Sequence, residues 1–263
     1  MKPAPFQYAR PRSLGHALDL LAQDEDARPL AGGQSLIPML NFRLARPSLL
    51  VDLNPLSELE RLHVSDGALR IGALTRQAAL LRSADVDERW ELLALAAAHV
   101  GHTAIRSRGT AGGSVAHADP AAELPVALTA LDARFRVRST AGDRTLSAAE
   151  MFVAALTTAL RPGELVVEIE VPAPPAGSRM AFAEHARTHG DFALAGVAVV
   201  LAPEEHAAIV LLGAGPTPVR AAAAERALLA GAGPGETARI AATGVADDHR
   251  RALLIALAVR ALE

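Results

Sequence analysis

The stretch that decides the fold is Ala31-Gly32-Gly33-Gln34-Ser35-Leu36, and a second glycine pair lies in Thr110-Ala111-Gly112-Gly113-Ser114. Each pair follows residues typical of a strand or turn and precedes an apolar run. At such turns backbone N–H groups can approach an anion because no Cβ intervenes, and the hydroxyl adds a donor. Either pair alone is equally consistent with a plain turn. Together they suit two adjacent phosphates, so we expect a dinucleotide held at its pyrophosphate.

Neither glycine pair matches a common nucleotide or nucleophile motif. No Gly-Lys-Ser/Thr follows, which excludes a P-loop, and the spacing is not that of the Rossmann fingerprint. Ile37 stands where a nucleophile elbow would need glycine. The sequence therefore gives no support to a hydrolase.

Composition limits the class of protein. The chain has 263 residues, of which 51% are hydrophobic and 21% charged, as in a globular protein. No apolar run is long enough to predict a transmembrane helix, and Met1–Pro5 lacks the apolar core of a signal peptide. We therefore expect a cytoplasmic protein. A net charge of −3 without a long basic run argues against nucleic acid as a partner.

The residue types that are absent limit the chemistry. The chain has no cysteine, which excludes disulfides, a cysteine nucleophile and a thiolate-held iron–sulfur cluster. If the protein handles electrons, any such cluster must lie on another chain. Lys2 is the only lysine, so no mid-chain lysine can be catalytic.

Residues 1–57 are predicted to form a small α/β unit. Strands at 6–9, 28–31 and 49–53 alternate with helices at 14–21 and 36–44, which favours a parallel sheet. Ser13 and Ser35 are the expected N-caps of the two helices. The first glycine pair then lies at a strand-to-helix turn, where parallel sheets bind ligands.

Residues 58–176 are predicted to form a second, mixed or antiparallel α+β unit. Asp66-Gly67 indicates a hairpin between strands at 62–65 and 68–71. Thr75 is expected to cap a short helix to Leu81. Apolar runs predict helices at 90–100 and 123–131, and alternation predicts strands at 134–138 and 166–171.

Residues 177–263 are predicted to form a small C-terminal α+β domain after a Pro-rich linker at 172–177. Runs at 180–187, 193–201 and 208–212 predict a three-stranded antiparallel sheet with helices on one side. The fold class is therefore α+β, with two subdomains followed by this third unit.

Six motifs in register carry a resemblance to a known family. They are Ala31–Pro38, Val51–Leu53, Ile71–Ala73, Ile105–Ser114, Asp119–Pro125 and Gly190–Gly196. In this order they resemble the FAD-binding (medium) subunits of molybdenum hydroxylases, a family that includes carbon monoxide dehydrogenase and the flavin module of xanthine dehydrogenase. The resemblance spans nearly the whole chain, including Asp248–Arg251 before the last helix.

The resemblance implies a two-subdomain FAD-binding fold and a set of cofactor contacts. The two glycine motifs match the loops that hold the FAD pyrophosphate, Glu123 matches an aspartate that binds sugar hydroxyls, and Ala183 or Glu184 matches a position on the far side of the flavin. Ser114 replaces a commoner asparagine. The cofactor-binding residues so implied are Ala31, Gly32, Gly33, Gln34, Ser35, Leu36, Val100, Thr110, Gly112, Gly113, Ser114, His117, Asp119, Glu123, Leu165 and Phe192.

Several of these side chains have two interpretations. Phe192 can pack in the core or flank the isoalloxazine ring. His117 and Asp119 can form a base and its orienting group, or His117 can lie beside the adenine or ribose. Arg106 and Arg108 can neutralise phosphate, or face solvent or a partner subunit.

A metal site is the weaker interpretation of two histidines. His99 and His102 have ligand-like spacing on or just after a helix, but no third ligand is evident nearby. We expect no metal in this chain.

The resemblance implies a role in electron transfer without catalytic residues in this chain. Substrate is hydroxylated on a molybdopterin-binding large subunit, electrons pass through [2Fe–2S] clusters of a small subunit, and FAD on this chain delivers them to an external acceptor. The assembly implied is a dimer of heterotrimers. A free-standing flavin oxidoreductase and a scaffold subunit without flavin remain as alternatives.

Overall fold

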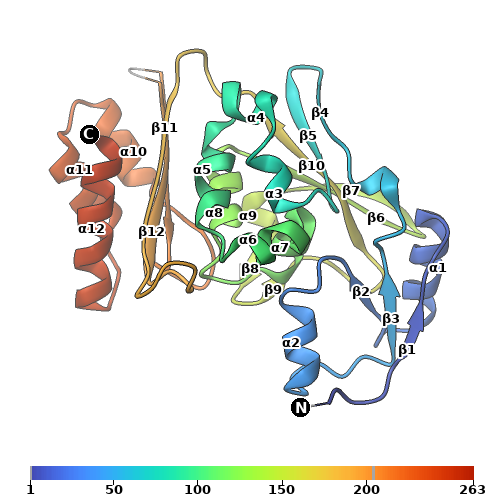
Figure 1. Cartoon of the computed structure of the whole chain (residues 1–263). Helices are drawn as coiled ribbons and strands as arrows, with labels where there is room; N and C mark the ends of the chain where they lie inside the picture. The colour runs from blue at the N-terminus through green and yellow to red at the C-terminus, as the bar shows by residue number, and fades with distance from the viewer. Residues whose placement is uncertain (1, 203–204) are drawn as a thin grey trace.

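The computed structural model describes residues 2–202 and 205–263 and is built on three main sheets (Figure 1). The N-terminal sheet is parallel, as predicted, with the strand order β1-β3-β2. We keep residues 57 and 176 as the working division between units. The N-terminal elements are β1 (Gln7–Ala9), α1 (Leu14–Gln23), β2 (Arg28–Leu30), α2 (Leu36–Asn41), β3 (Leu49–Asp52) and the 3-10 helix η1 (Ser57–Leu59).

Helix α1 is fixed by a cap and by one apolar face. Ser13 Oγ accepts a hydrogen bond from the His16 N–H at 3.2 Å, which confirms the predicted N-cap. Ala17, Leu18 and Leu21 are buried in the core of this unit. The helical spacing of these three residues therefore positions α1 against the sheet.

Helix α2 begins at Leu36, as predicted, but differs from the prediction in its cap and in its C-terminal end. Ser35 makes no capping hydrogen bond through its side chain, so the predicted cap was wrong. The helix ends at Asn41 rather than Leu44, because Arg43 adopts a left-handed φ of 59°. Leu44 lies beyond this turn and is 75% exposed.

The two serines provide a stability prediction. Ser13→Ala should lower the free energy of unfolding by about 1 kcal/mol, because it leaves a helix N–H without its acceptor. Ser35→Ala is the matched control and should change the stability of the flavin-free protein by only a few tenths of a kcal/mol. Urea unfolding of both variants measures the difference. Equal losses would contradict the assigned cap.

The middle sheet is five-stranded and antiparallel throughout, in the order β4-β5-β10-β6-β7. One face of β10 contributes Ile169 and Val171 to the largest core, and the other contributes Leu165 and Val167 to the core around α1. This sheet therefore joins the first two units. Its strands are β4 (Leu62–Ser65), β5 (Ala68–Gly72), β6 (Arg134–Ser139), β7 (Gly142–Ser147) and β10 (Leu165–Pro172).

Helices cover one face of this sheet (Figure 1). The cap predicted at Thr75 was wrong: Thr75 Oγ1 donates to the Arg61 carbonyl at 3.2 Å, and α3 begins at Gln77. The remaining elements of the unit are α3 (Gln77–Leu80), α4 (Ala84–Arg89), α5 (Glu91–His99), α6 (Thr103–Arg108), α7 (Ala111–His117), α8 (Glu123–Ala130), α9 (Ala148–Met151), β8 (Phe152–Ala154) and β9 (Thr157–Thr158).

The C-terminal sheet has four strands in the order β11-β12-β13-β14, rather than the three predicted. The fourth strand has only two residues, too few to show an alternating pattern. The elements are β11 (Arg179–His185), β12 (Ala195–Ala202), β13 (His206–Leu212), β14 (Val219–Arg220), α10 (Ala222–Leu229), α11 (Pro234–Ala241) and α12 (Asp248–Leu262).

The C-terminal helices lie on one side of this sheet, as predicted, and helices of the second unit cover its other face. Val197 and Val199 of β12 pack toward the C-terminal helices, whereas Ala198 and Val200 belong to the core formed with α5 and α8. Figure 1 shows the sheet standing between these two groups of helices. In the described part of the chain, no helix is long and apolar enough to span a membrane.

Candidate functional site

The first glycine motif is the turn from β2 into α2. Gly33 has a left-handed φ of 73°, which favours glycine, and its carbonyl accepts the Ile37 N–H. Gln34 Nε2 donates to the Gly32 carbonyl at 3.2 Å. Among the described residues, no acceptor contacts the backbone N–H groups of residues 32–35. Several donors at this turn are therefore available to a ligand.

The second glycine motif forms the first turn of α7 rather than a loop. Thr110 is the N-cap, and its Oγ1 accepts the Gly113 N–H at 3.1 Å. The Gly112 N–H donates to the Ala73 carbonyl, and a Cβ on Gly112 would lie 2.6 Å from the Ala73 Cβ. Gly112 therefore lets the helix pack against the end of β5.

The two motifs lie against each other. A Cβ added to Gly32 would overlap the Arg108 carbonyl and lie 2.9 Å from the Gly109 Cα. A Cβ on Gly113 would lie 3.7 Å from the Ala31 Cβ. The backbone that precedes α7 thus touches the turn that precedes α2, as expected for one site built by two subdomains.

Two residues that the sequence analysis missed hold this contact in place. Asn54 Nδ2 donates to the Ala31 carbonyl at 3.0 Å. The Arg76 guanidinium donates to the Arg108 carbonyl at 2.6 Å and to Asn54 Oδ1 at 2.7 Å. Asn54 and Arg76 stand just after a strand and just before a helix, and their sequence neighbourhood gives no signal for this bridge.

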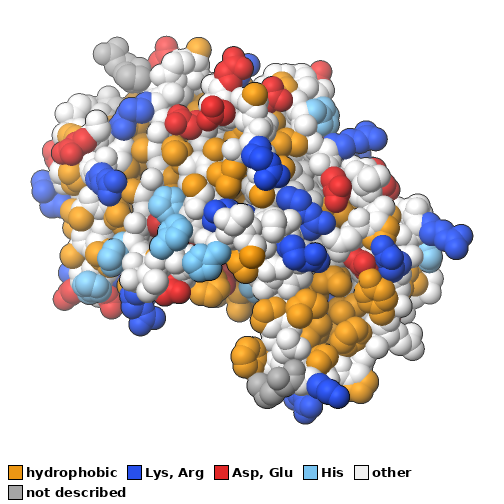
Figure 2. All heavy atoms as spheres, viewed as in Figure 1, with side chains coloured by type: hydrophobic (Ala, Val, Ile, Leu, Met, Phe, Trp, Pro, Cys, Tyr) orange, Lys and Arg blue, Asp and Glu red, His pale blue; other side chains and the backbone are white. Residues whose placement is uncertain are grey.

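A cavity of about 490 Å³ opens at the first motif. Tyr8 and Asp52 line it, and the Tyr8 hydroxyl donates to Asp52 Oδ2 at 2.5 Å. Figure 2 shows Lys and Arg side chains gathered at the centre of the face over α3 and α6, which favours an anionic ligand. The remaining lining residues are Leu30, Ala31, Gly32, Gly33, Gln34, Ile37, Pro38, Asn54 and Arg108.

The two arginines before α7 have different roles. Arg106 donates to the carbonyls of Val100 and Gly101 at 2.8 and 2.9 Å and so caps the end of α5. Arg108 lines the cavity beside the first glycine motif. Of the two, Arg108 is therefore the one that lies at the cavity.

A second group of predicted residues lies between α5, α8 and β11. Glu123 begins α8 and is only 7% exposed. Burial raises the pKa of its carboxyl to about 7, and the nearby charge of Glu184 acts in the same direction. The His117 Nε2 lies 3.8 Å from Asp119 Oδ2, at the left-handed turn that ends α7.

Phe192 lies at the surface of the loop between β11 and β12. Its side chain is 74% exposed, so the core-packing interpretation was wrong. Gly190 in the same loop has a φ of 86°, and a Cβ there would lie 2.7 Å from the His102 Nδ1. The loop therefore rests on the turn that follows α5.

Leu165 does not lie with the predicted cofactor contacts around Glu123. It is 4% exposed and belongs to the core formed with α1. The metal interpretation of His99 and His102 gains no support, because the described residues contain no group of three His, Cys, Asp or Glu able to hold an ion.

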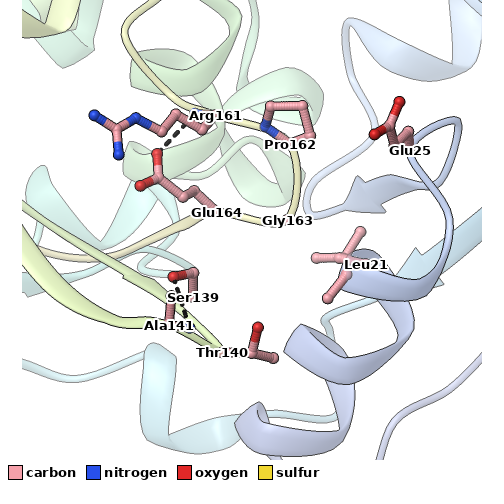
Figure 3. Close-up of a pocket in the computed structure, with 10 residues that line it drawn as sticks. Leu21, Glu25, Ser139, Thr140, Ala141, Arg161, Pro162, Gly163 and Glu164 are labelled. Atoms are coloured by element: carbon pink, nitrogen blue, oxygen red, sulfur yellow. Dashed lines mark hydrogen bonds between the residues drawn. The ribbon is translucent and has the colours of Figure 1, made fainter.

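A separate cavity of about 280 Å³ lies between α1 and the β6–β7 turn (Figure 3). Its Glu164 accepts from Arg144 at 2.7 Å and from the Arg161 N–H at 2.7 Å. The Arg161 guanidinium extends away from Leu21 and Glu25 in Figure 3. Glu164 is therefore satisfied within the protein, and neither glycine motif reaches this cavity.

The residues at the glycine motifs fit FAD. Free N–H groups and Arg108 suit a pyrophosphate, and the group around Glu123 offers polar contacts beyond it. Leu165 is the predicted contact least suited to this, because it is buried elsewhere.

Comparisons with known proteins agree with this fit. The family model described as the FAD binding domain in molybdopterin dehydrogenase matches residues 4–174. The alpha subunit of the 6-hydroxypseudooxynicotine dehydrogenase complex of Paenarthrobacter nicotinovorans is 47% identical over 87% of this chain and 79% of its own length. The caffeine dehydrogenase subunit beta of a Pseudomonas strain is 40% identical over 87% and 80%.

A solved structure extends the likeness to the C-terminal unit. Carbon monoxide dehydrogenase from Hydrogenophaga pseudoflava superposes with a TM-score of 0.94 at 38% identity, covering 100% of this chain and 97% of that chain. The match to the family model over residues 4–174 and the sequence identities of 40% and 47% show common family membership, and not only a shared fold. The chain therefore belongs to the FAD-binding subunits of the molybdenum hydroxylases, which are oxidoreductases, and its cofactor is FAD.

Proposed function

We propose that this chain takes electrons from the [2Fe–2S] clusters of a partner subunit and passes them, through FAD, to an external acceptor. The observation that carries the proposal is the contact between the two glycine motifs, with free N–H donors at residues 32–35. FAD, when bound, supplies the redox chemistry. The chain's own residues bind and orient the cofactor.

The proposed contacts divide the cofactor between the two groups of residues. The pyrophosphate lies at residues 31–36 and 110–114, with Arg108 beside it. Glu123 contacts sugar hydroxyls, Val100 and Phe192 lie toward the flavin, and His117 and Asp119 lie beside the cofactor, with His117 near the adenine or ribose. We leave Leu165 out, because its side chain is enclosed by the core around α1.

The proposal also names partners. The chain has no cysteine, so thiolate-held clusters must come from another subunit. The relatives are named as a complex subunit, a medium subunit or a medium chain. We infer a molybdopterin-binding large subunit, a [2Fe–2S] small subunit and a dimer of such heterotrimers, located in the cytoplasm.

Purification with the co-expressed partners tests this function. The complex should show a flavin absorption spectrum at about one FAD per chain, and reduction of the clusters should bleach the flavin. Gly33→Asp should lose the flavin, because a carboxylate would enter the anion site at a left-handed position. Substrate oxidation by the isolated chain would favour a free-standing oxidoreductase. Assembly of a complex without flavin would favour a scaffold.

A further inference from the structure

A buried carboxylate holds an exposed histidine at the end of α5. The Nδ1 of His99 lies 3.2 Å from Oε1 of Glu184 on β11. The Glu184 side chain is 7% exposed, whereas that of His99 is 38% exposed. A ligand can therefore reach the imidazole but not the carboxylate beneath it.

Within the part of the chain that the structure describes, neither Lys nor Arg forms an ion pair with Glu184. Within the described residues, His99 is the ion-pair partner of Glu184, and Glu184 Oε2 is buried without a hydrogen bond. Burying a carboxylate with an unpaired oxygen is costly, so the pair does not serve stability well. A carboxylate on Nδ1 fixes the ring and leaves Nε2 for a ligand.

His99 lies near Glu123, which is proposed above to contact the cofactor. Glu123 is near enough to raise the pKa of His99, although the Glu184 hydrogen bond is the larger cause. The Phe182 ring packs 5.3 Å from the imidazole. Figure 2 shows histidines gathered on this face. The other titratable groups that act here are Glu123, which acts on His99, and Asp119, which acts on Glu123.

We propose that His99, oriented by Glu184, donates a hydrogen bond from Nε2 to an acceptor atom on the flavin end of FAD. The inference rests on the proposed placement of the cofactor. His99 is then a binding residue and Glu184 a positioning residue. The pairing of His99 with Glu184 cannot be predicted from the sequence, because the two residues are 85 positions apart on α5 and β11.

The pair makes the contact depend on pH. Protonated His99 donates from both nitrogens, whereas neutral His99 with its proton on Nδ1 can only accept at Nε2. The contact is therefore present below the pKa of His99 and lost above it. Because Glu184 raises that pKa above its ordinary value, the contact persists further into the neutral range.

Two ligands allow the pyrophosphate end and the flavin end of the site to be tested separately. The full chain, freed of flavin, is titrated with FAD and with ADP, which carries the pyrophosphate but no flavin. For the wild type, FAD affinity should fall about tenfold between about pH 6 and pH 8.5, and ADP affinity should fall much less. His99→Gln keeps a donor at every pH, so the excess fall for FAD should disappear. Glu184→Gln should move the fall to lower pH, because the carboxylate that favours the charged imidazole is gone.

His63→Gln is the matched control, because His63 is an exposed histidine on β4. It should retain the wild-type profile. A wild-type profile in His99→Gln, or an unmoved midpoint in Glu184→Gln, would overturn the inference. Failure of the wild type to bind either FAD or ADP would instead overturn the proposed site.

Discussion

Gly32→Ala is expected to weaken FAD binding at least about a hundredfold, equivalent to about 2.7 kcal/mol. The added methyl group would overlap the Arg108 carbonyl and lie 2.9 Å from the Gly109 Cα. Both obstacles are backbone, so neither can rotate away, and the two glycine motifs must separate. A pyrophosphate held between the two motifs would then lose its contacts on one side.

The measurement is a fluorescence titration of the flavin-free chain with FAD. Gly233→Ala is the control, since a Cβ there meets nothing within 4 Å and the residue does not have a left-handed φ. Circular dichroism should show that both variants are folded. Wild-type affinity in a folded Gly32→Ala protein would mean that the contact between the motifs is not needed for the cofactor.

The same contact shows where inference from sequence succeeds. The first glycine motif stands between a strand and a helix, and this alternation predicts both a parallel sheet and a ligand-binding turn. Gly33 has a left-handed φ of 73°, a conformation that favours glycine. Gly32 and Gly112 serve instead to let backbones approach, which depends on partners distant in sequence.

The misses have a common physical origin. Strand β12 is apolar at nearly every position, which is the pattern of a strand covered on both faces, but the covering helices α5 and α8 precede it by many residues. The caps assigned to Ser35 and Thr75 failed because each was placed by local pattern alone. Asn54, Arg76 and the His99–Glu184 pair could not be found for the same reason: their roles exist only once the subdomains meet.

Glu123→Gln is expected to stabilise the flavin-free chain at neutral pH and above, although the residue is proposed to bind the cofactor. Burial raises the pKa of this carboxyl to about 7, from an ordinary value of 4.5. The folded state then holds its proton more tightly than the unfolded chain does. Stability is consequently lost as the pH rises from about 4.5 to about 7, and the loss is complete above that range.

The size of the pKa shift of Glu123 sets the size of the expected change in stability. A rise from 4.5 to about 7 corresponds to about 3 kcal/mol in the free energy of unfolding. Glutamine carries no proton to lose, so the advantage of the variant over wild type should be small near pH 5 and should approach that value near pH 8. Urea unfolding at the two pH values measures it. Glu236→Gln, the same exchange at an exposed position on α11, should give no such difference.

A loss of stability in Glu123→Gln would be as informative as the expected gain. If Glu123→Gln destabilised the flavin-free chain at about pH 8, the carboxylate would be engaged in the folded protein by a partner strong enough to offset its burial. With the expected sign, the chain keeps an acid that weakens its own fold beside His99 and Glu184. A carboxyl group that lowers the stability of the fold but lies at a proposed cofactor site is best explained by a role in binding the cofactor. Added FAD should therefore narrow the gap in stability between wild type and variant, because a carboxylate accepts hydrogen bonds from sugar hydroxyls more strongly than an amide does.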